Sequence, residues 1–209
     1  MSKFKQILQS TLGKHEPKEY EELILDNFWE NKLALTKDEK EGIEEYKNLI
    51  HLSMNNIGLK SLENFPAIKN LYYLSLNNNE LNGDDLDLIP QLFPGLKKLK
   101  ISGNVIEKIN NFSKLRNLKL RKIEVKENPF SIGNTTYKKK LFQLIPTLQI
   151  IDQEDQAGEE VETTDYHNEE GELEDDDDYN EEEENEDDNK DDDKGENSGE
   201  EDDDEGDDE

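Results

Sequence analysis

The residues of this chain with the types needed for chemistry are histidines and carboxylates, but their spacing matches no catalytic motif. His15, His51 and His167 are far apart, and no carboxylate around them has the spacing of a metal or hydrolase motif. The acids of residues 82–87 lack the ligand spacing of a calcium loop. The chain has no cysteine, which excludes thiolate metal ligands and disulfides. We therefore expect no catalytic, metal or cofactor site and no enzyme.

The carboxylates gather at one end of the chain, where they suit the binding of cationic groups. From Asp152 to the last residue there are 35 Asp or Glu residues and two lysines, a formal charge of −33, whereas residues 1–151 carry +4. Each carboxylate can accept charge-assisted hydrogen bonds from Lys or Arg, so the segment imitates the charge of a nucleic-acid backbone. Its candidate binding residues are Asp175, Asp176, Asp177, Asp178, Glu181, Glu182, Glu183, Glu184, Asp191, Asp192 and Asp193.

The same segment has too few apolar residues to offset the entropy of ordering the chain, so residues 155–209 are expected to be a disordered acidic tail. Charges more than roughly 8 Å apart are screened at physiological salt, so binding by the tail should be diffuse and salt-sensitive. A solubilising or spacer tail without a partner is the alternative. Ser198 has an acid three residues on, which an acidophilic kinase favours. It is a candidate phosphosite, although an unmodified serine fits equally well.

The elements that would position a binding surface are leucine-rich repeats. The stretches LYYLSLNNNEL, from Leu71, and LKKLKISGNVI, from Leu96, both fit the pattern L-x-x-L-x-L-x-x-N-x-L. Each repeat predicts a short strand with its leucines pointing inward, and its asparagine, Asn79 or Asn104, is expected to satisfy backbone groups inside the turn. Repeats of this kind stack on their neighbours. The predicted fold class is therefore α/β, a leucine-rich-repeat solenoid with a parallel sheet.

Weaker copies flank these two repeats. LIHLSMNNIGL begins at Leu49 and LRNLKLRKIEV at Leu115. Ile57 and Ile123 take their asparagine positions. The step from Leu96 to Leu115 is 19 residues, shorter than the other steps of 22 and 25, which predicts a tight loop rather than a helix between these repeats. EELILDN and LQIID are incomplete copies at the two ends of the series.

Both ends of the solenoid show capping elements, which a stack of repeats needs to cover its terminal leucines. One apolar helical face precedes the first repeat, and another follows the last repeat before Pro146. Thr36 and Glu39 have the spacing of a capping box. The capped domain is expected to cover residues 1–154. The two helical faces consist of Phe4, Ile7, Leu8 and Leu12, followed by Gly13, and of Tyr137, Leu141, Leu144 and Ile145.

Residues beside the inward leucines project from the concave face of the sheet, and many of those in the third and fourth repeats are basic. One interpretation is that these cations only solvate an exposed sheet. The other is that they bind an anion, either the acidic tail in a closed form or an acidic partner such as RNA. Two tyrosines beside them could stack on a base or anchor a peptide. The candidate binding residues are Tyr72, Tyr73, Lys97, Lys98, Lys100, Arg116, Lys119, Arg121 and Lys122.

Several stretches of the chain follow the order found in a known family. They are ELILDN, HLSMNNIGLKSLENFP, LYYLSLNNNELNG, LKKLKISGNVI and YKKKLFQLIPTLQIIDQED, followed at once by the acidic tail. On these residues the chain resembles the acidic leucine-rich nuclear phosphoprotein 32 family. The resemblance implies a right-handed solenoid with a concave parallel sheet and a nuclear, non-enzymatic binding protein. Histone binding and chaperoning, inhibition of a type 2A phosphatase and roles in RNA export are attributed to this family.

Together with the acidic tail, the resemblance makes core histones the expected partners of a nuclear histone chaperone. A type 2A phosphatase inhibitor and a scaffold for an RNA-processing factor are the alternatives. We expect a nuclear monomer with no direct binding to DNA, with shuttling to the cytoplasm left open. No membrane association is expected, because no stretch of about 18 apolar residues could span a bilayer. The short fourth repeat and the acidic last residues, EGDDE in place of a basic cluster, depart from the family pattern.

Overall fold

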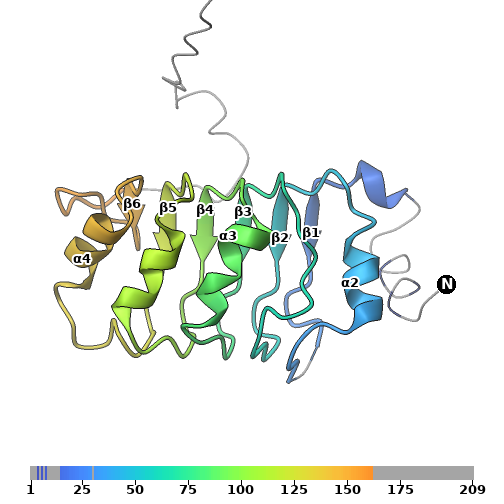
Figure 1. Cartoon of the computed structure of the whole chain (residues 1–209), viewed down its shortest axis with the longest axis horizontal. Helices are drawn as coiled ribbons and strands as arrows, with labels where there is room; N and C mark the ends of the chain where they lie inside the picture. Colours follow the sequence, from blue (N-terminus) through green and yellow to red (C-terminus); the bar gives the residue numbers. More distant parts are fainter. Residues whose placement is uncertain (1–3, 5, 7, 9–14, 30, 162–209) are drawn as a thin grey trace, which may run out of the picture. The chain divides into compact units, whose positions relative to one another are not determined.

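The computed structural model describes residues 4, 6, 8, 15–29 and 31–161. All described residues belong to one compact unit, Met1–Thr164. The acidic segment from residue 162 onward lies outside the described residues, and the expected boundary between residues 154 and 155 stays a prediction. In this unit, six short parallel strands lie side by side in chain order (Figure 1). They are β1 (Glu22–Ile24), β2 (His51–Ser53), β3 (Tyr73–Ser75), β4 (Lys98–Lys100), β5 (Lys122–Glu124) and β6 (Ile150–Ile151).

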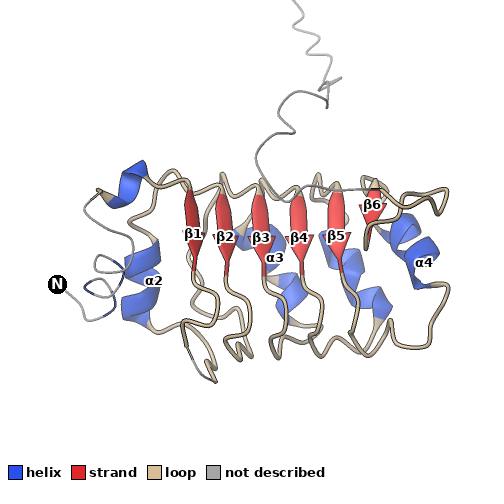
Figure 2. Cartoon of the chain, turned by 180° about the vertical axis from the view of Figure 1, so that it is seen from behind, coloured by secondary structure: helices blue, strands red, loops and turns tan. Residues whose placement is uncertain are grey.

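Each coil returns from one strand to the next through helical turns or loops. Figure 2 shows the strands in front and the helices of the central and last coils behind them. The face of the sheet that points away from these helices is the one predicted to be concave, and we call it the outer face. The predicted leucine-rich-repeat solenoid with a parallel sheet is thus confirmed. The helical elements are η1 (Pro17–Glu19), α2 (Lys37–Ile43), η2 (Asp85–Asp87), α3 (Ile89–Leu92), η3 (Ile109–Leu115) and α4 (Tyr137–Leu144).

The core consists of apolar rows that run across the strands. Leu52 pairs in register with Leu74, Leu74 with Leu99, and Leu99 with Ile123. All four side chains are at most 1% exposed. Burying a side chain of this size stabilises the fold by about 1.5–3 kcal/mol relative to leaving it exposed. Because each coil covers only its neighbours, these rows tie successive repeats together.

Buried asparagines close the turn of each coil, as predicted for Asn79 and Asn104. The Asn79 side chain accepts hydrogen bonds from the amides of Ile57 (3.2 Å) and Leu59 (3.0 Å) and donates to the Met54 carbonyl (2.9 Å). The Asn104 side chain accepts from the Leu81 amide at 3.0 Å. It donates to the carbonyls of Leu76 (2.9 Å) and Ile101 (3.1 Å).

The expected register of the fourth repeat is wrong. Strand β5 pairs Ile123 with Leu99, so Ile123 belongs to the buried leucine row and not to the asparagine position. That position is taken by Asn128, whose side chain accepts from the Ile106 amide (3.2 Å) and donates to the Val125 carbonyl (3.0 Å). The repeat therefore begins at Leu120, 24 residues after Leu96, and has an ordinary length.

The predicted tight loop before this repeat is wrong for the same reason. Once the repeat starts at Leu120, the preceding coil has room for a helical return, and η3 occupies residues Ile109–Leu115. Phe112 and Leu115 of η3 are fully buried. The leucines that suggested a strand beginning at Leu115 instead end this helix and enter the following turn.

A left-handed residue recurs three positions after each of the first five strands. Asn27, Asn56, Asn78, Gly103 and Glu127 have φ values of 57°, 56°, 55°, 65° and 61°. Asn and Gly tolerate this conformation better than other residues, which explains their use at four of the five positions. The recurrence supports the same register for the fourth repeat.

The caps follow the sequence pattern where the structure describes them. Phe4 and Leu8 are buried, and the Phe4 ring stacks on Trp29 with 5.7 Å between ring centres. Ile7, Leu12 and Gly13 lie outside the described residues. At the other end, α4 buries Leu141 and is followed by the buried Ile145, while Tyr137 and Leu144 are partly buried against the core, as expected.

Near the first cap, α2 begins with the predicted capping box. The Glu39 amide donates to the Thr36 hydroxyl (3.3 Å), and the Thr36 amide donates to a Glu39 carboxylate oxygen (2.8 Å). The ammonium of Lys32 also donates to the Glu39 carboxylate at 2.7 Å. Among the described residues, no helix is long and apolar enough to cross a membrane.

Candidate functional site

The structure brings together most, but not all, of the residues expected on the concave face. Tyr73, Lys98, Lys100 and Lys122 lie on β3, β4 and β5. Tyr72, Lys97 and Arg121 each precede one of these strands by one residue. Arg116 and Lys119 are the corrections: Arg116 follows η3 as its C-cap, and Lys119 lies in the connection between η3 and β5. Both were placed on the sheet because the repeat was expected to begin five residues too early, at Leu115 and not at Leu120. We call Lys97, Lys98, Lys100, Arg121 and Lys122 the basic half of the outer face.

One row of the outer face crosses the first five strands in register. It pairs Glu22 with His51, His51 with Tyr73, Tyr73 with Lys98, and Lys98 with Lys122. His51 Nδ1 lies 2.7 Å from a carboxylate oxygen of Glu22, and its ring centre is 4.1 Å from that of Tyr73. The row thus changes from an acid at β1, through two rings, to ammonium groups at β4 and β5.

The two tyrosines of the face lie beneath lysines of the neighbouring strand. Lys98 Nζ is 5.7 Å from the centre of the Tyr72 ring, and Lys100 Nζ is 5.8 Å from the centre of the Tyr73 ring. Such cation–π contacts are favourable because the ring face carries partial negative charge. Lys100 Nζ also lies 3.2 Å from a carboxylate oxygen of Glu124 on β5.

A second row is bound into a ladder of side chains. Asp26 accepts from the Ser53 hydroxyl (2.7 Å) and from the amide of Asn55 (2.8 Å). Asn55 in turn accepts from the Ser75 hydroxyl (2.8 Å) and from the amide of Asn77 (2.7 Å). These polar groups were expected to project from the face, but they bond to one another across the strands. They stiffen the β1–β3 half of the face.

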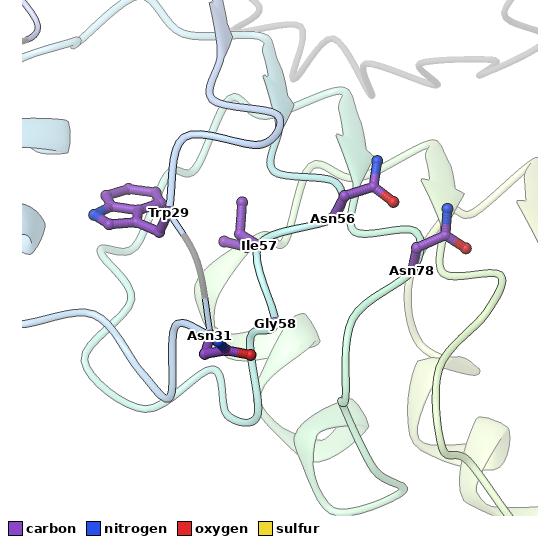
Figure 3. A pocket seen from close by; sticks show the side chains of 6 residues that line it. All are labelled: Trp29, Asn31, Asn56, Ile57, Gly58 and Asn78. Atoms are coloured by element: carbon purple, nitrogen blue, oxygen red, sulfur yellow. The ribbon is translucent and has the colours of Figure 1, made fainter.

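An open cavity lies at the turn after the first strands (Figure 3). Its volume is about 370 Å³. Asn56 and Asn78 line it from neighbouring coils and point the same way in the figure, with Trp29 on the other side of the opening. The remaining lining residues are Asn31, Ile57 and Gly58. Since none of these six residues titrates or acts as a nucleophile, the cavity offers contact surface without catalytic groups.

A glycine in this cavity wall is required by close packing. Gly58 has a φ of 67°, and a Cβ atom there would lie 2.8 Å from the Cα of Asn31. Any other residue would both adopt the left-handed conformation and push against the backbone of the neighbouring coil. The sequence did not predict this cavity, because its residues come from three successive coils and share no motif.

Among the described residues, the groups with shifted pKa values lie in the packing of the repeats and caps. Burial raises the pKa of Glu39, but hydrogen bonds from Lys32 and Thr36 outweigh this effect and leave its pKa below the usual range. Burial, with smaller contributions from Tyr20 and Glu45, raises the pKa of Tyr46 to about 12.

A third perturbed group anchors the final cap. Burial and then a hydrogen bond to Asp152 raise the pKa of Tyr137. The Tyr137 hydroxyl donates to Asp152 Oδ2 at 2.6 Å, while Oδ1 of the same carboxylate accepts from the Val125 amide at 2.7 Å. Within the part of the chain that the structure describes, no group of three or more His, Cys, Asp or Glu side chains could hold a metal ion.

Comparison with known proteins decides the family. No family model matches the chain. Two relatives from Caenorhabditis elegans, named acidic leucine-rich nuclear phosphoprotein 32-related proteins 1 and 2, are 31% and 32% identical over 166 and 163 residues. The matches cover 78% and 75% of this chain and 69% and 68% of those relatives. This chain belongs to the acidic leucine-rich nuclear phosphoprotein 32 family. The resemblance inferred from the sequence is thereby confirmed.

Other members of the acidic leucine-rich nuclear phosphoprotein 32 family are longer. A related protein from Plasmodium falciparum is 36% identical over 155 residues, and the match covers 73% of this chain. This chain spans about half of that relative's length, since the match covers 54% of it.

Among solved structures, the Drosophila melanogaster SNF/U2A' complex contains a similar fold. Its matching chain has a TM-score of 0.51 and 22% identity, over 68% of this chain and 75% of that chain. This likeness supports the leucine-rich-repeat architecture seen for this family member.

Proposed function

We propose that this protein is a non-enzymatic, nuclear histone-binding protein of the chaperone type. The observation that carries the proposal is the uneven charge: 35 acids against two lysines from Asp152 onward, on a repeat domain that carries +4 before that point. The family relatives are named as acidic nuclear phosphoproteins, which supports a nuclear location. The described residues also offer binding surfaces but no group arranged for catalysis.

The mechanism follows from the charge. Core histones are basic proteins, and each carboxylate of the acidic segment can accept charge-assisted hydrogen bonds from their Lys and Arg side chains. A polyanion of this density competes with DNA for the same basic groups and so shields them from promiscuous contact. The attraction is spread over many weak pairs, and it should fall steeply as salt shortens the screening length.

In the proposed function, the repeat domain provides a binding surface of fixed shape. The β1–β3 half of its outer face is held in place by the ladder from Asp26 to Asn77, which bonds neighbouring coils to one another. A rigid face can select partners by shape and charge, whereas the acidic segment attracts any basic surface. Generic attraction and selectivity are therefore assigned to different parts of the chain.

The test is a pull-down of core histones by the full chain and by a chain ending after Asp155, over a series of salt concentrations. We expect the full chain to retain histones at low salt and to release them as salt rises, and the shortened chain to retain little. Equal retention by both chains would overturn the proposal. A matched control keeps the length but replaces the acids of residues 174–193 by Asn and Gln, and it should retain less histone than the full chain at every salt concentration.

The full chain and the shortened chain also test the two alternative functions. A regulatory inhibitor would change the rate of a type 2A phosphatase when added in stoichiometric amount. A scaffold for RNA-processing factors would keep its partner from nuclear extract after the acidic segment is removed. We expect neither result.

A further inference from the structure

The turn between β3 and η2 contains the one Asn–Gly pair of the sequence, Asn82 and Gly83. Asn82 is exposed, and its side-chain oxygen accepts a hydrogen bond from the Asp84 amide at 2.8 Å. This contact is an Asx turn, and the ring of atoms that it closes includes the peptide nitrogen of Gly83. The hydrogen bond therefore holds the Asn82 side-chain carbon (Cγ) near that nitrogen, and it polarises the carbonyl group that the nitrogen can attack.

Glycine leaves the attacking nitrogen accessible, and packing explains why glycine is present. Within the described part of the chain, no group accepts a hydrogen bond from the Gly83 N–H. Gly83 also has no Cβ atom that could shield its nitrogen. A Cβ atom at this position would lie 2.5 Å from the side chain of Asn111, which belongs to η3 in the next coil. The neighbouring coil therefore requires a glycine beside Asn82.

A second Asx turn in the chain lacks the glycine. The side-chain oxygen of Asn134 accepts a hydrogen bond from the Thr136 amide at 3.2 Å, so this turn encloses the nitrogen of Thr135. Thr135 is β-branched, and its side chain crowds that nitrogen. Asn134 is therefore an internal comparison, in which the turn is present but the attacking nitrogen is hindered.

We propose that Asn82 is a modification site that converts spontaneously to aspartate and isoaspartate in the folded protein. The Gly83 nitrogen attacks Cγ of Asn82, and the bond from Cγ to the side-chain nitrogen breaks. That nitrogen takes up the proton of the Gly83 N–H and leaves as ammonia. Water then opens the resulting succinimide at either carbonyl carbon, which yields aspartate or isoaspartate at position 82. The reaction needs no partner protein, so it is independent of histone binding.

The conversion would weaken a contact between two coils. The Asn82 amide donates to Oδ2 of Asp85 at 3.0 Å, and the Leu62 amide of the preceding coil donates to Oδ1 of the same carboxylate at 2.9 Å. Asp85 is only 4% exposed. Isoaspartate lengthens the backbone beside these bonds by a methylene group, and either product adds a negative charge to the turn. The converted protein should therefore unfold more readily than the parent chain.

The experiment incubates the full chain at mildly alkaline pH and follows each asparagine by peptide mapping with mass spectrometry. An enzyme that methylates isoaspartyl carboxylates identifies the isoaspartate product. We expect Asn82 to convert at least about tenfold faster than Asn134, which corresponds to an activation barrier lower by about 1.4 kcal/mol. The rate at Asn82 should fall at mildly acidic pH, because the attacking nitrogen must give up its proton.

A matched pair of variants tests the role of the Asx turn. Asp84→Pro removes the N–H that bonds to Asn82, and the φ of Asp84, −75°, suits proline. Asp84→Asn removes the same charge but keeps the N–H. Conversion at Asn82 should be at least about threefold slower in Asp84→Pro than in Asp84→Asn, because Cγ is no longer held beside the nitrogen. Thermal unfolding of both variants checks that they are folded.

Two results would overturn the proposal. Conversion at Asn82 that is no faster than at Asn134 would show that the fold protects the Asn–Gly pair. Equal rates in the Asp84→Pro and Asp84→Asn variants would show that the Asx turn does not create the reactive arrangement. Fast conversion at Asn82 that depends on the Asp84 N–H supports the site.

Discussion

At the scale of single residues, the buried asparagines contribute most to the geometry of each turn. The Asn104 side chain accepts from the Leu81 amide and donates to the Leu76 carbonyl of the preceding coil, and it also donates to the Ile101 carbonyl of its own coil. An unsatisfied buried polar group costs about 1–3 kcal/mol. The Asn104→Ala variant should therefore lower the free energy of unfolding by about 2–4 kcal/mol, as measured by urea denaturation. The exposed Asn70→Ala change should shift it by no more than about 0.5 kcal/mol, and similar losses in both variants would contradict this role.

A second residue-scale prediction concerns pH. The folded-state pKa of Glu39 is depressed, so its contribution to stability is present above the unfolded-state pKa and is lost as the pH falls through the folded-state pKa. Glu39→Gln leaves the partly buried Lys32 without its carboxylate and should cost about 2 kcal/mol at pH 7.

Chemical denaturation of the parent chain and the variant at pH 7 and pH 3 measures this effect. The stability difference should shrink at pH 3, which lies below the unfolded-state pKa, because protonation there favours the unfolded parent chain. Glu41→Gln, at an exposed position of the same helix, serves as the control and should change little at either pH. A Glu39→Gln deficit that stays constant with pH would point to lost packing and not to lost charge.

These residue roles differ in how far the sequence could predict them. Thr36 and Glu39 act over three residues, and Asn79 and Asn104 lie in complete repeat motifs, so local patterns sufficed. The hydrogen bonds of Asn55 and Asn77 cross from coil to coil. Which polar groups of the outer face bond to one another depends on the strand register, and a single repeat does not contain that information.

At the scale of elements, the fourth repeat shows how a correct motif can be assigned to the wrong segment. Leu115, Leu118 and Leu120 have the spacing of a strand, but all three are buried around the end of η3. The true strand has Ile123 and Val125 in place of leucines. The signal that could have decided the register was Asn128, eight residues after Leu120, as Asn104 is eight residues after Leu96.

The Ile123→Asn variant distinguishes the two registers. In the register expected from the sequence, position 123 belongs to the turn and an asparagine there would complete the motif and be tolerated or stabilising. In the structure, Ile123 is fully buried in the leucine row, and an amide there would lose apolar burial and lack partners. We expect the free energy of unfolding to fall by about 3–5 kcal/mol, measured by urea denaturation. Lys119→Asn, at an exposed site of the same repeat, is the control, and a stable Ile123→Asn variant would contradict the register.

At the scale of the whole molecule, the charge of each segment could be counted from the sequence, and the order of the coils followed from the repeats. The grouping of the basic half could be predicted only in part. Lys97, Lys98 and Lys100 were assigned correctly because their repeat is complete. Arg116 and Lys119 were placed on the sheet by the same error that misplaced the fourth strand. Positions on a solenoid face depend on register, whereas net charge does not.

In the proposed function, the acidic segment attracts basic proteins through its charge density. If the acidic segment binds basic proteins through many interchangeable carboxylates, the order of its residues should not matter. Scrambling residues 162–209 keeps their composition, length and net charge, and histone binding should stay within about twofold of the parent chain over a salt series measured by fluorescence anisotropy. A variant of equal length with Asn and Gln in place of the acids should lose binding. A scrambled chain that also loses binding would reveal a sequence-specific recognition motif, because charge density would then be insufficient to explain the affinity.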